Sequence, residues 1–243
     1  VEYSGQLANV RAQMVALPEY FPIIGAADAD RVCAREDFGH GPIQDWLAET
    51  AQCYGIWIFA GSLPLTAADP EKMRNTSLVY NPAGECVKRY DKIHLFGFKK
   101  GNEAYDEAAF IEAGDQLVAV DTPFGRVALS ICYDLRFPEL YRALGTVDLI
   151  MLPAAFTEVT GRAHWEILLR ARAIENQCYV LAIGQGGVHE NRRETHGNSM
   201  LIDPWGDIVA RRDKGAGVVI GELDHARIAE VRTSLPALTH RVL

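Results

Sequence analysis

The sequence lacks several features that would place it in other classes of protein. No apolar run approaches the ~20 residues that a membrane-spanning helix needs. The first five residues have neither a basic start nor an apolar stretch, so they do not read as a targeting signal. No linker, low-complexity segment or block of like charge interrupts the 243 residues. We therefore expect a cytoplasmic protein with no membrane partner and a single domain over residues 1–243.

Positive charge and paired cysteines are also scarce. The chain has 24 Lys and Arg against 32 Asp and Glu, a net charge of −8, which argues against a nucleic-acid partner. The five cysteines are scattered without a CxxC pair, which argues for a reducing compartment and against both a disulfide framework and a zinc knuckle. His189 and His196 bracket a polar loop but lack a third metal ligand. No helix opens after "GQGG" at 184–187, as a dinucleotide loop would require, so we expect neither metal nor cofactor.

The chain does contain short apolar strands that alternate with helices and hairpins. This alternation predicts an α/β fold, with mixed sheets covered by helices. The expected helices cover residues 42–55, 137–145, 163–177 and 224–234. The expected strands cover residues 14–19, 56–65, 147–156, 178–184 and 217–224, with hairpins at 76–92, 117–134 and 199–211 and a polar loop at about 93–115.

One cysteine occupies an unusual position in this pattern. In "SICYDLRFPEL" (130–140), Cys132 ends an apolar strand, and Pro138 then lies in the first turn of a helix. A thiol with an ordinary pKa near about 8.5 needs a base or a cation to attack an unactivated carbonyl. Cysteine is more often a small core residue, and we assign that role to the other four, Cys33, Cys53, Cys86 and Cys178.

Two charged residues also close apolar strands, Glu19 after "MVALP" and Lys92 after "CVKRYD". Taken alone, a charged residue at such a position more often only marks where a strand meets solvent. A sheet, however, collects its functional side chains at the ends of its strands. A carboxylate there can take a thiol proton, and an ammonium beside it can stabilise a thiolate and a developing oxyanion.

The segments that hold these residues resemble a known family. "LPEYF", "RYDKIHLF" and "ICYDLRFPEL", in this order and spacing, are similar to the three catalytic blocks of the nitrilase superfamily of carbon–nitrogen hydrolases. The resemblance runs from about residue 15 to the C-terminus and includes "TGRAHWEILLRARAIENQCYV", "GNSMLIDPWG" and "LPALTHR". It implies an α-β-β-α sandwich that forms a homodimer or a higher homo-oligomer. Members usually have a strand and a full helix before the first block, so we expect a shortened or incomplete first βα unit here.

The resemblance also implies roles for particular residues. The family's general base falls on Glu19, its lysine on Lys92 and its nucleophile on Cys132. A second glutamate of the family, seven residues before a glycine, falls on Glu107; the alternative is that Glu107 is one acid of an acidic loop. The implied reaction is hydrolysis of a small amide by water through a thioester, without metal or cofactor, with the backbone N–H of Tyr133 helping Lys92 to hold the oxyanion.

Within the superfamily, the chain looks most like the branch of omega-amidases and deaminated-glutathione amidases, whose substrates carry carboxylates. A pocket for a carboxylate needs cationic or hydroxyl groups. Arg136 and Thr160 are the candidates, with Phe156 as a wall; the alternative for Arg136 is that it braces the corner after Cys132. A carbamoylase or a nitrilase of the same superfamily is a rival function. A non-catalytic scaffold is another, although it would be expected to lack one of Glu19, Lys92 and Cys132.

Overall fold

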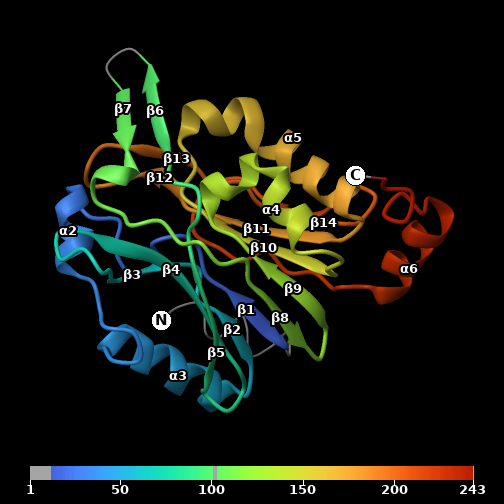
Figure 1. The fold of residues 1–243 in the computed structure, drawn as a ribbon, viewed down its shortest axis with the longest axis horizontal. Coiled ribbons are helices and arrows are strands. Elements are labelled where there is room, and N and C mark those ends of the chain that lie inside the picture. The colour runs from blue at the N-terminus through green and yellow to red at the C-terminus, as the bar shows by residue number, and fades with distance from the viewer. Residues whose placement is uncertain (1–11, 101–102, 243) are drawn as a thin grey trace. The chain divides into compact units, whose positions relative to one another are not determined.

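The structure is a computed structural model that describes residues 12–100 and 103–242 (Figure 1). The chain divides into two compact units. The first runs up to Gln116 and includes Val188–Arg193, and the second comprises Leu117–Gly187 and Glu194–Leu243. The expectation of a single domain stays a prediction. None of the described helices is long and apolar enough to cross a membrane.

The first unit contains a five-stranded mixed sheet within its described residues. Its strands are β1 (Met14–Ala16), β2 (Trp57–Phe59), β3 (Leu63–Thr66), β4 (Met73–Tyr80) and β5 (Cys86–Asp91). β1 pairs in parallel with β2, whereas β4 pairs antiparallel with β2, β3 and β5. The unit also contains helices α2 (Asp28–Cys33) and α3 (Pro42–Tyr54), a hairpin of β6 (Gly97–Lys100) and β7 (Glu103–Asp106), and the 3₁₀ turn η1 (Glu107–Ala109).

Local signals define helix α3 as the sequence predicted. Pro42 is at its start, where its missing N–H costs nothing, and Gly55 ends it with φ 62°. Leu47 and Ala51 point into a core that also contains Ile58 and Leu78 of the sheet. The apolar face of the helix is therefore buried against strands β2 and β4 of the sheet.

The second unit contains a six-stranded mixed sheet within its described part. The strand order is β15 (Ile208–Arg212), β14 (Ser199–Ile202), β11 (Tyr179–Gly184), β10 (Leu149–Ala154), β9 (Gly125–Leu129) and β8 (Ala119–Thr122). β9, β10 and β11 are parallel, and the outer pairings are antiparallel. Helices α4 (Pro138–Ala143), α5 (Glu158–Asn176) and α6 (His225–Ser234) accompany this sheet, and β12 (Gly186–Val188) and β13 (Glu194–His196) form a separate two-stranded sheet. The predicted α/β class is confirmed in both units.

Several predicted elements differ in the structure. Residues 217–224 form no strand: Ile220 is 51% exposed, and the segment has no ladder partner among residues 12–100 and 103–242 despite its apolar pattern. The single strand expected at 56–65 is two strands that turn at Gly61 (φ 56°). The expected loop at 93–115 contains the β6–β7 hairpin, and α5 begins at Glu158 rather than at 163 because Thr157 caps it.

The burial of the cysteines corrects another expectation. Cys178 is buried as predicted, but Cys33, Cys53 and Cys86 are exposed, so the core role assigned to them is wrong. Each lies at the end or on the outer face of its element, and residue type alone did not reveal that. The expectation of a shortened first βα unit falls on residues 1–11, which lie outside the described residues.

Candidate active site

The first unit buries an ammonium group between two carboxylates. Lys92 directly follows β5, and its side chain is fully buried. Its Nζ lies 3.1 Å from Oε1 of Glu19 and 2.8 Å from Oε2 of Glu107. A buried cation is costly unless it is paired and hydrogen-bonded, and these two carboxylates supply that pairing. The structure thus brings together three of the four residues predicted to be catalytic.

Glu19 is held by the turn that follows β1. Its carboxylate accepts a hydrogen bond from the side-chain amide of Asn75 at 2.9 Å, and only 1% of the residue is exposed. The next residue, Tyr20, has φ 53°, a backbone conformation that is uncommon outside glycine. Gly61 allows this turn to pack closely, because a Cβ there would lie 2.1 Å from the carbonyl oxygen of Pro18. The local backbone therefore fixes the direction of the Glu19 side chain.

Glu107 is the first residue of η1, directly after the hairpin. Its Oε2 also accepts a hydrogen bond from the backbone N–H of Phe96, at 2.7 Å. Burial raises the pKa of the Glu107 carboxyl; the ammonium of Lys92 lowers this pKa and the charge of Glu19 raises it. Glu107 thus lies against Lys92, and its role as the family's second glutamate stays a prediction.

Cys132 occupies a strained corner of the second unit. It is the first residue of the 3₁₀ turn η2 (Cys132–Arg136), with φ 49° and an exposed fraction of 8%. The buried carboxylate of Asp134 accepts a hydrogen bond from the N–H of Ile131 at 2.8 Å and stabilises the turn from within. Pro138 then begins α4, as predicted. A positive φ at a side chain that can act as a nucleophile is found at many functional sites.

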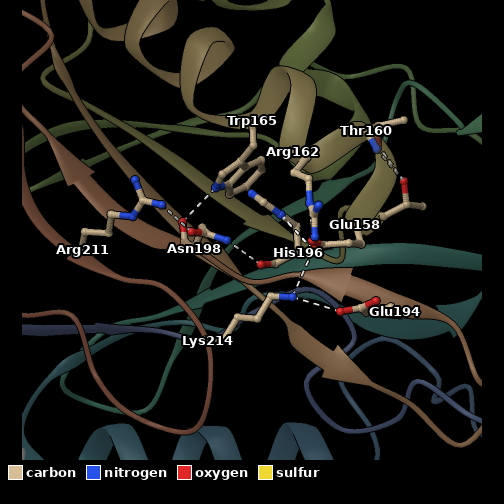
Figure 2. Close-up of polar contacts among 10 residues, drawn as sticks. Glu158, Thr160, Arg162, Trp165, Glu194, His196, Asn198, Arg211 and Lys214 are labelled. Atoms are coloured by element: carbon tan, nitrogen blue, oxygen red, sulfur yellow. Dashed lines mark hydrogen bonds and ion pairs between the residues drawn. The ribbon is translucent and has the colours of Figure 1, made fainter.

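The four predicted pocket residues fall into two groups that make different contacts. The guanidinium of Arg136 lies 5.7 Å from the ring centroid of Tyr133 and 5.2 Å from that of Phe156, and its Nη1 is 3.2 Å from Nδ1 of His164. These contacts bring Arg136, Tyr133 and Phe156 together. Thr160 instead lies in the first turn of α5, where its hydroxyl is 2.7 Å from the hydroxyl of Thr157 (Figure 2).

The sequence analysis missed a group of charged residues at the start of α5. Glu158 lies at its centre, 3.0 Å from Nδ1 of His196, 3.0 Å from Nε of Arg162 and 3.3 Å from Nζ of Lys214 (Figure 2). The hydrogen bond from His196, together with those from Arg162 and Lys214, lowers the pKa of Glu158 to about 2. The His196 ring packs on Gly161, where a Cβ would lie 2.3 Å from its Cγ. The sequence signal that could have revealed this group is an acidic residue, Glu158, in the first turn of a helix after the capping Thr157.

His196, a candidate metal ligand by sequence, contacts the Glu158 carboxylate through Nδ1. Among residues 12–100 and 103–242, no group of three or more His, Cys, Asp or Glu side chains is arranged to hold a metal ion. The expectation that the protein needs neither metal nor cofactor stays a prediction.

Known proteins share both the sequence and the fold of this chain. A family model described as carbon–nitrogen hydrolase matches residues 1–233. The chain is 39% identical to a deaminated glutathione amidase of Yersinia enterocolitica, over 99% of this chain and 85% of the relative. It is 36% identical to the human deaminated glutathione amidase, over 97% of this chain and 74% of the relative.

Solved structures give the same result. The carbon–nitrogen hydrolase superfamily protein XC1258 from Xanthomonas campestris, described with an arsenic adduct in its active site, superposes with a TM-score of 0.85 at 30% identity, over 100% of this chain and 90% of that one. The NitFhit protein of Caenorhabditis elegans superposes with a TM-score of 0.89 at 38% identity, over 98% of this chain and 58% of that one. The family match, the relatives and the folds agree, and the chain belongs to the carbon–nitrogen hydrolases of the nitrilase superfamily, enzymes that hydrolyse carbon–nitrogen bonds.

Proposed function

We propose that this protein is a cysteine-dependent amidase in which Cys132 attacks a small amide and Glu19, Lys92 and Glu107 serve the attack. The observation that carries the proposal is the buried Lys92 ammonium, whose Nζ contacts the carboxylates of both Glu19 and Glu107. An ion pair of this kind is a poor way to stabilise a fold, since apolar residues of the same volume often do as well. Its presence in a member of a hydrolase family is better explained by chemistry.

The proposed reaction proceeds in two halves. Glu19 takes the proton of the Cys132 thiol, and the thiolate forms a bond to the amide carbon while the carbonyl electrons move to oxygen. Lys92 and the backbone N–H of Tyr133 stabilise that oxyanion. The oxyanion then collapses, the carbon–nitrogen bond breaks, and Glu19 returns the proton to the departing amine or ammonia.

The second half removes the acyl group from the enzyme. A water molecule gives a proton to Glu19 and attacks the thioester carbon, the carbon–sulfur bond breaks, and the proton returns to the Cys132 sulfur. The products are a carboxylic acid and an amine or ammonia. Glu107 orients Lys92 throughout, through the two oxygens that lie 2.8 and 3.0 Å from Nζ.

We further propose that the substrate is the ω-amide of a 2-oxo acid or deaminated glutathione, both of which carry a carboxylate. The support is the group of Arg136, Tyr133 and Phe156, of which Tyr133 and Arg136 follow Cys132 within the same turn η2. A guanidinium held over aromatic rings can still bind a carboxylate through its edge. Relatives that are 36–42% identical carry the name deaminated glutathione amidase. We also propose a cytoplasmic location, because scattered cysteines without a paired motif are typical of proteins in a reducing compartment.

We also propose a homodimer that uses the outer face of α5. Ile167 and Ile174 lie seven residues apart, on one face of that helix, and are 71% and 48% exposed. Trp205, 51% exposed, extends the apolar surface, since Gly206 beside it packs directly against Ile174. An apolar patch of this kind, on a protein of a family expected to form oligomers, fits a second copy of the chain.

A substrate panel tests the proposed activity. Purified protein is given deaminated glutathione, a 2-oxo acid ω-amide, an N-carbamoyl amino acid and an aliphatic nitrile, and the acid, ammonia and carbon dioxide released are measured. We expect turnover of the first two without carbon dioxide. Turnover of the carbamoyl compound with carbon dioxide, or of the nitrile alone, would assign the protein to a rival activity of the superfamily.

A further inference from the structure

A buried arginine in the first unit has no place in the reaction described above. Arg31 lies on helix α2, and only 5% of it is exposed. Its guanidinium carbon lies 4.6 Å from the ring centroid of Tyr20 and 5.1 Å from that of Phe110. A guanidinium at these distances from aromatic rings is attracted to them, most strongly where water is excluded. Arg31 therefore joins two rings that are 90 residues apart in the chain.

Both rings are attached to the backbone that carries the Lys92-binding carboxylates. Tyr20 directly follows Glu19. Phe110 ends η1, the turn that begins with Glu107, and its N–H donates to the carbonyl oxygen of Glu107 at 3.1 Å. A shift of either ring would move the neighbouring carboxylate relative to Nζ of Lys92.

The backbone at Tyr20 makes this dependence stronger. Its φ of 53° is not a conformation that a tyrosine adopts by preference, so contacts must hold it. One is the hydrogen bond from the Tyr20 N–H to Oγ of Ser62, at 3.0 Å. The stacking of Arg31 on the Tyr20 ring is another, and it acts on the side chain rather than on the backbone.

The polar contacts of Arg31 fix it in place. Nη1 donates to the carbonyl oxygen of Ile24 at 3.1 Å, and Nη2 donates to Oδ1 of Asp28 at 2.5 Å. The same Asp28 oxygen accepts from Nη1 of Arg193 at 3.1 Å, and the Arg193 guanidinium lies 4.8 Å from the ring centroid of Tyr105. Tyr105 precedes Glu107 by two residues, so arginines joined through Asp28 contact rings on both sides of that glutamate.

The surroundings of Arg31 argue against a purely space-filling role. The neighbouring cluster of Tyr20, Met73 and Ile111 is apolar, with Val32, Leu95 and Phe110 packed against it. Nε of Arg31 is buried and has no hydrogen-bond partner among the described residues. An apolar side chain of similar size would fill this position without burying a charge.

We propose that Arg31 is a positioning residue, which holds the carboxylates of Glu19 and Glu107 on Lys92 by stacking between Tyr20 and Phe110. The inference rests on the proposed function, since it assigns a purpose to the alignment of those carboxylates. Arg31 itself touches neither the substrate nor the reacting atoms. Its effect on the reaction is transmitted through the two rings.

The test compares three arginine variants with wild type, using deaminated glutathione as substrate. Arg31→Met keeps length and apolar volume but removes the cation, and Arg31→Lys keeps the charge without the flat stacking surface. Arg35→Met is the matched control, because Arg35 follows the same helix and donates to backbone carbonyls of Val32 and Pro70. The measurements are kcat and KM separately, and kcat/KM against pH.

We expect Arg31→Met to lower kcat by roughly tenfold or more, as small misplacements of catalytic groups do. KM should stay within about threefold. The pH at which kcat/KM is half-maximal should shift by about half a unit, because the charges of Glu19, Lys92 and Glu107 are rearranged. Arg31→Lys should recover part of kcat, and Arg35→Met should match wild type. If Arg31→Met instead matches Arg35→Met in kcat and in pH profile, Arg31 only fills space and the inference is overturned.

Two further variants keep the outcome clear. If Arg31→Met does not fold, as judged by circular dichroism, Phe110→Leu is the substitute, because it removes one stacking ring with less disturbance. It should give the same fall in kcat, and an unchanged kcat would overturn the inference.

Glu19→Gln separates the inference from the function on which it rests. An active wild type, an inactive Glu19→Gln and a normal Arg31→Met would contradict only the inference, whereas a fully active Glu19→Gln would contradict both.

Discussion

The side chain of Cys132 decides whether the proposed chemistry occurs at all. Cys132→Ala removes the only group to which the acyl portion would be bonded, so hydrolysis should fall by several orders of magnitude while the fold persists. Steady-state rates together with far-ultraviolet circular dichroism measure both. Cys178→Ala in the buried core and Cys53→Ala on the surface are controls and should keep the wild-type rate. A Cys132→Ala protein that retains a tenth of the activity would rule out the thioester mechanism.

The charged partners of Cys132 can be tested through the reactivity of the thiol itself. Glu19→Gln keeps the shape of the side chain but cannot accept a proton, and Lys92→Met removes the buried cation. Both should slow alkylation of Cys132 by iodoacetamide near neutral pH and lower kcat by roughly a hundredfold or more. Mass spectrometry of the Cys132 peptide follows the alkylation, with exposed Cys53 as an internal reference. Alkylation of Cys132 at the wild-type rate in both variants would separate these residues from the nucleophile.

Combining these changes gives a sharper test. If Glu19, Lys92 and Cys132 act as one unit, adding Glu19→Gln or Lys92→Met to Cys132→Ala should cost little further activity. Independent, multiplying losses would show that the residues act separately.

At the scale of an element, helix α5 depends on Glu158 in its first turn. Hydrogen bonding by His196, Arg162 and Lys214 lowers the Glu158 pKa from an ordinary 4.5 to about 2. A carboxyl whose pKa is lowered by folding stabilises the folded state above its unfolded pKa, and that contribution is lost as the pH falls through the folded pKa. The contribution of Glu158 should therefore be complete above about pH 4.5 and disappear between pH 4.5 and about pH 2.

Urea unfolding at several pH values measures this contribution. Glu158→Gln should be less stable than wild type by about 1 kcal/mol near pH 6, as expected for charge-assisted hydrogen bonds that are partly exposed. The difference should shrink as the pH falls toward 2. Glu166→Gln on the same helix is the control: its contacts with Arg170 and Arg211 are exposed, and it should change stability by well under ~1 kcal/mol. A constant difference between wild type and Glu158→Gln down to pH 2.5 would contradict the assigned cause.

At the scale of the whole molecule, the exposed face of α5 predicts self-association. Ile167→Glu places a charge in the middle of the proposed interface, where it would be buried without a partner, and should convert the dimer to a monomer or weaken it by several kcal/mol. Light scattering after size exclusion gives the mass. Tyr54→Glu on α3, where Tyr54 is 53% exposed, is the control and should leave the mass unchanged. A wild-type protein with the mass of one chain at micromolar concentration would refute the proposed dimer.

The sequence by itself determined the elements whose boundaries depend on local chemistry. Proline and glycine placed helix α3 and the turns of the three predicted hairpins, which the structure has at 81–84, 122–125 and 203–206. Those residues restrict or permit backbone angles regardless of their distant neighbours. The three motifs also pointed to Glu19, Lys92 and Cys132, since a nucleophile, a base and a cation at strand ends are the groups that the proposed reaction needs. Their catalytic roles stay a prediction. The family match confirms the class that those motifs implied.

The tertiary structure alone decided which of these residues meet. Glu107 could not be told from its acidic neighbours until the chain returned it to within 2.8 Å of Lys92, and Arg31 gave no signal because its partners are rings 11 and 79 residues away. Residues 217–224 had the pattern of a strand but formed no ladder with the described residues, because apolar side chains alone do not pair a strand with a neighbour. Contacts between distant residues and the pairing of strand edges depend on how the whole chain closes, and no local pattern contains that information.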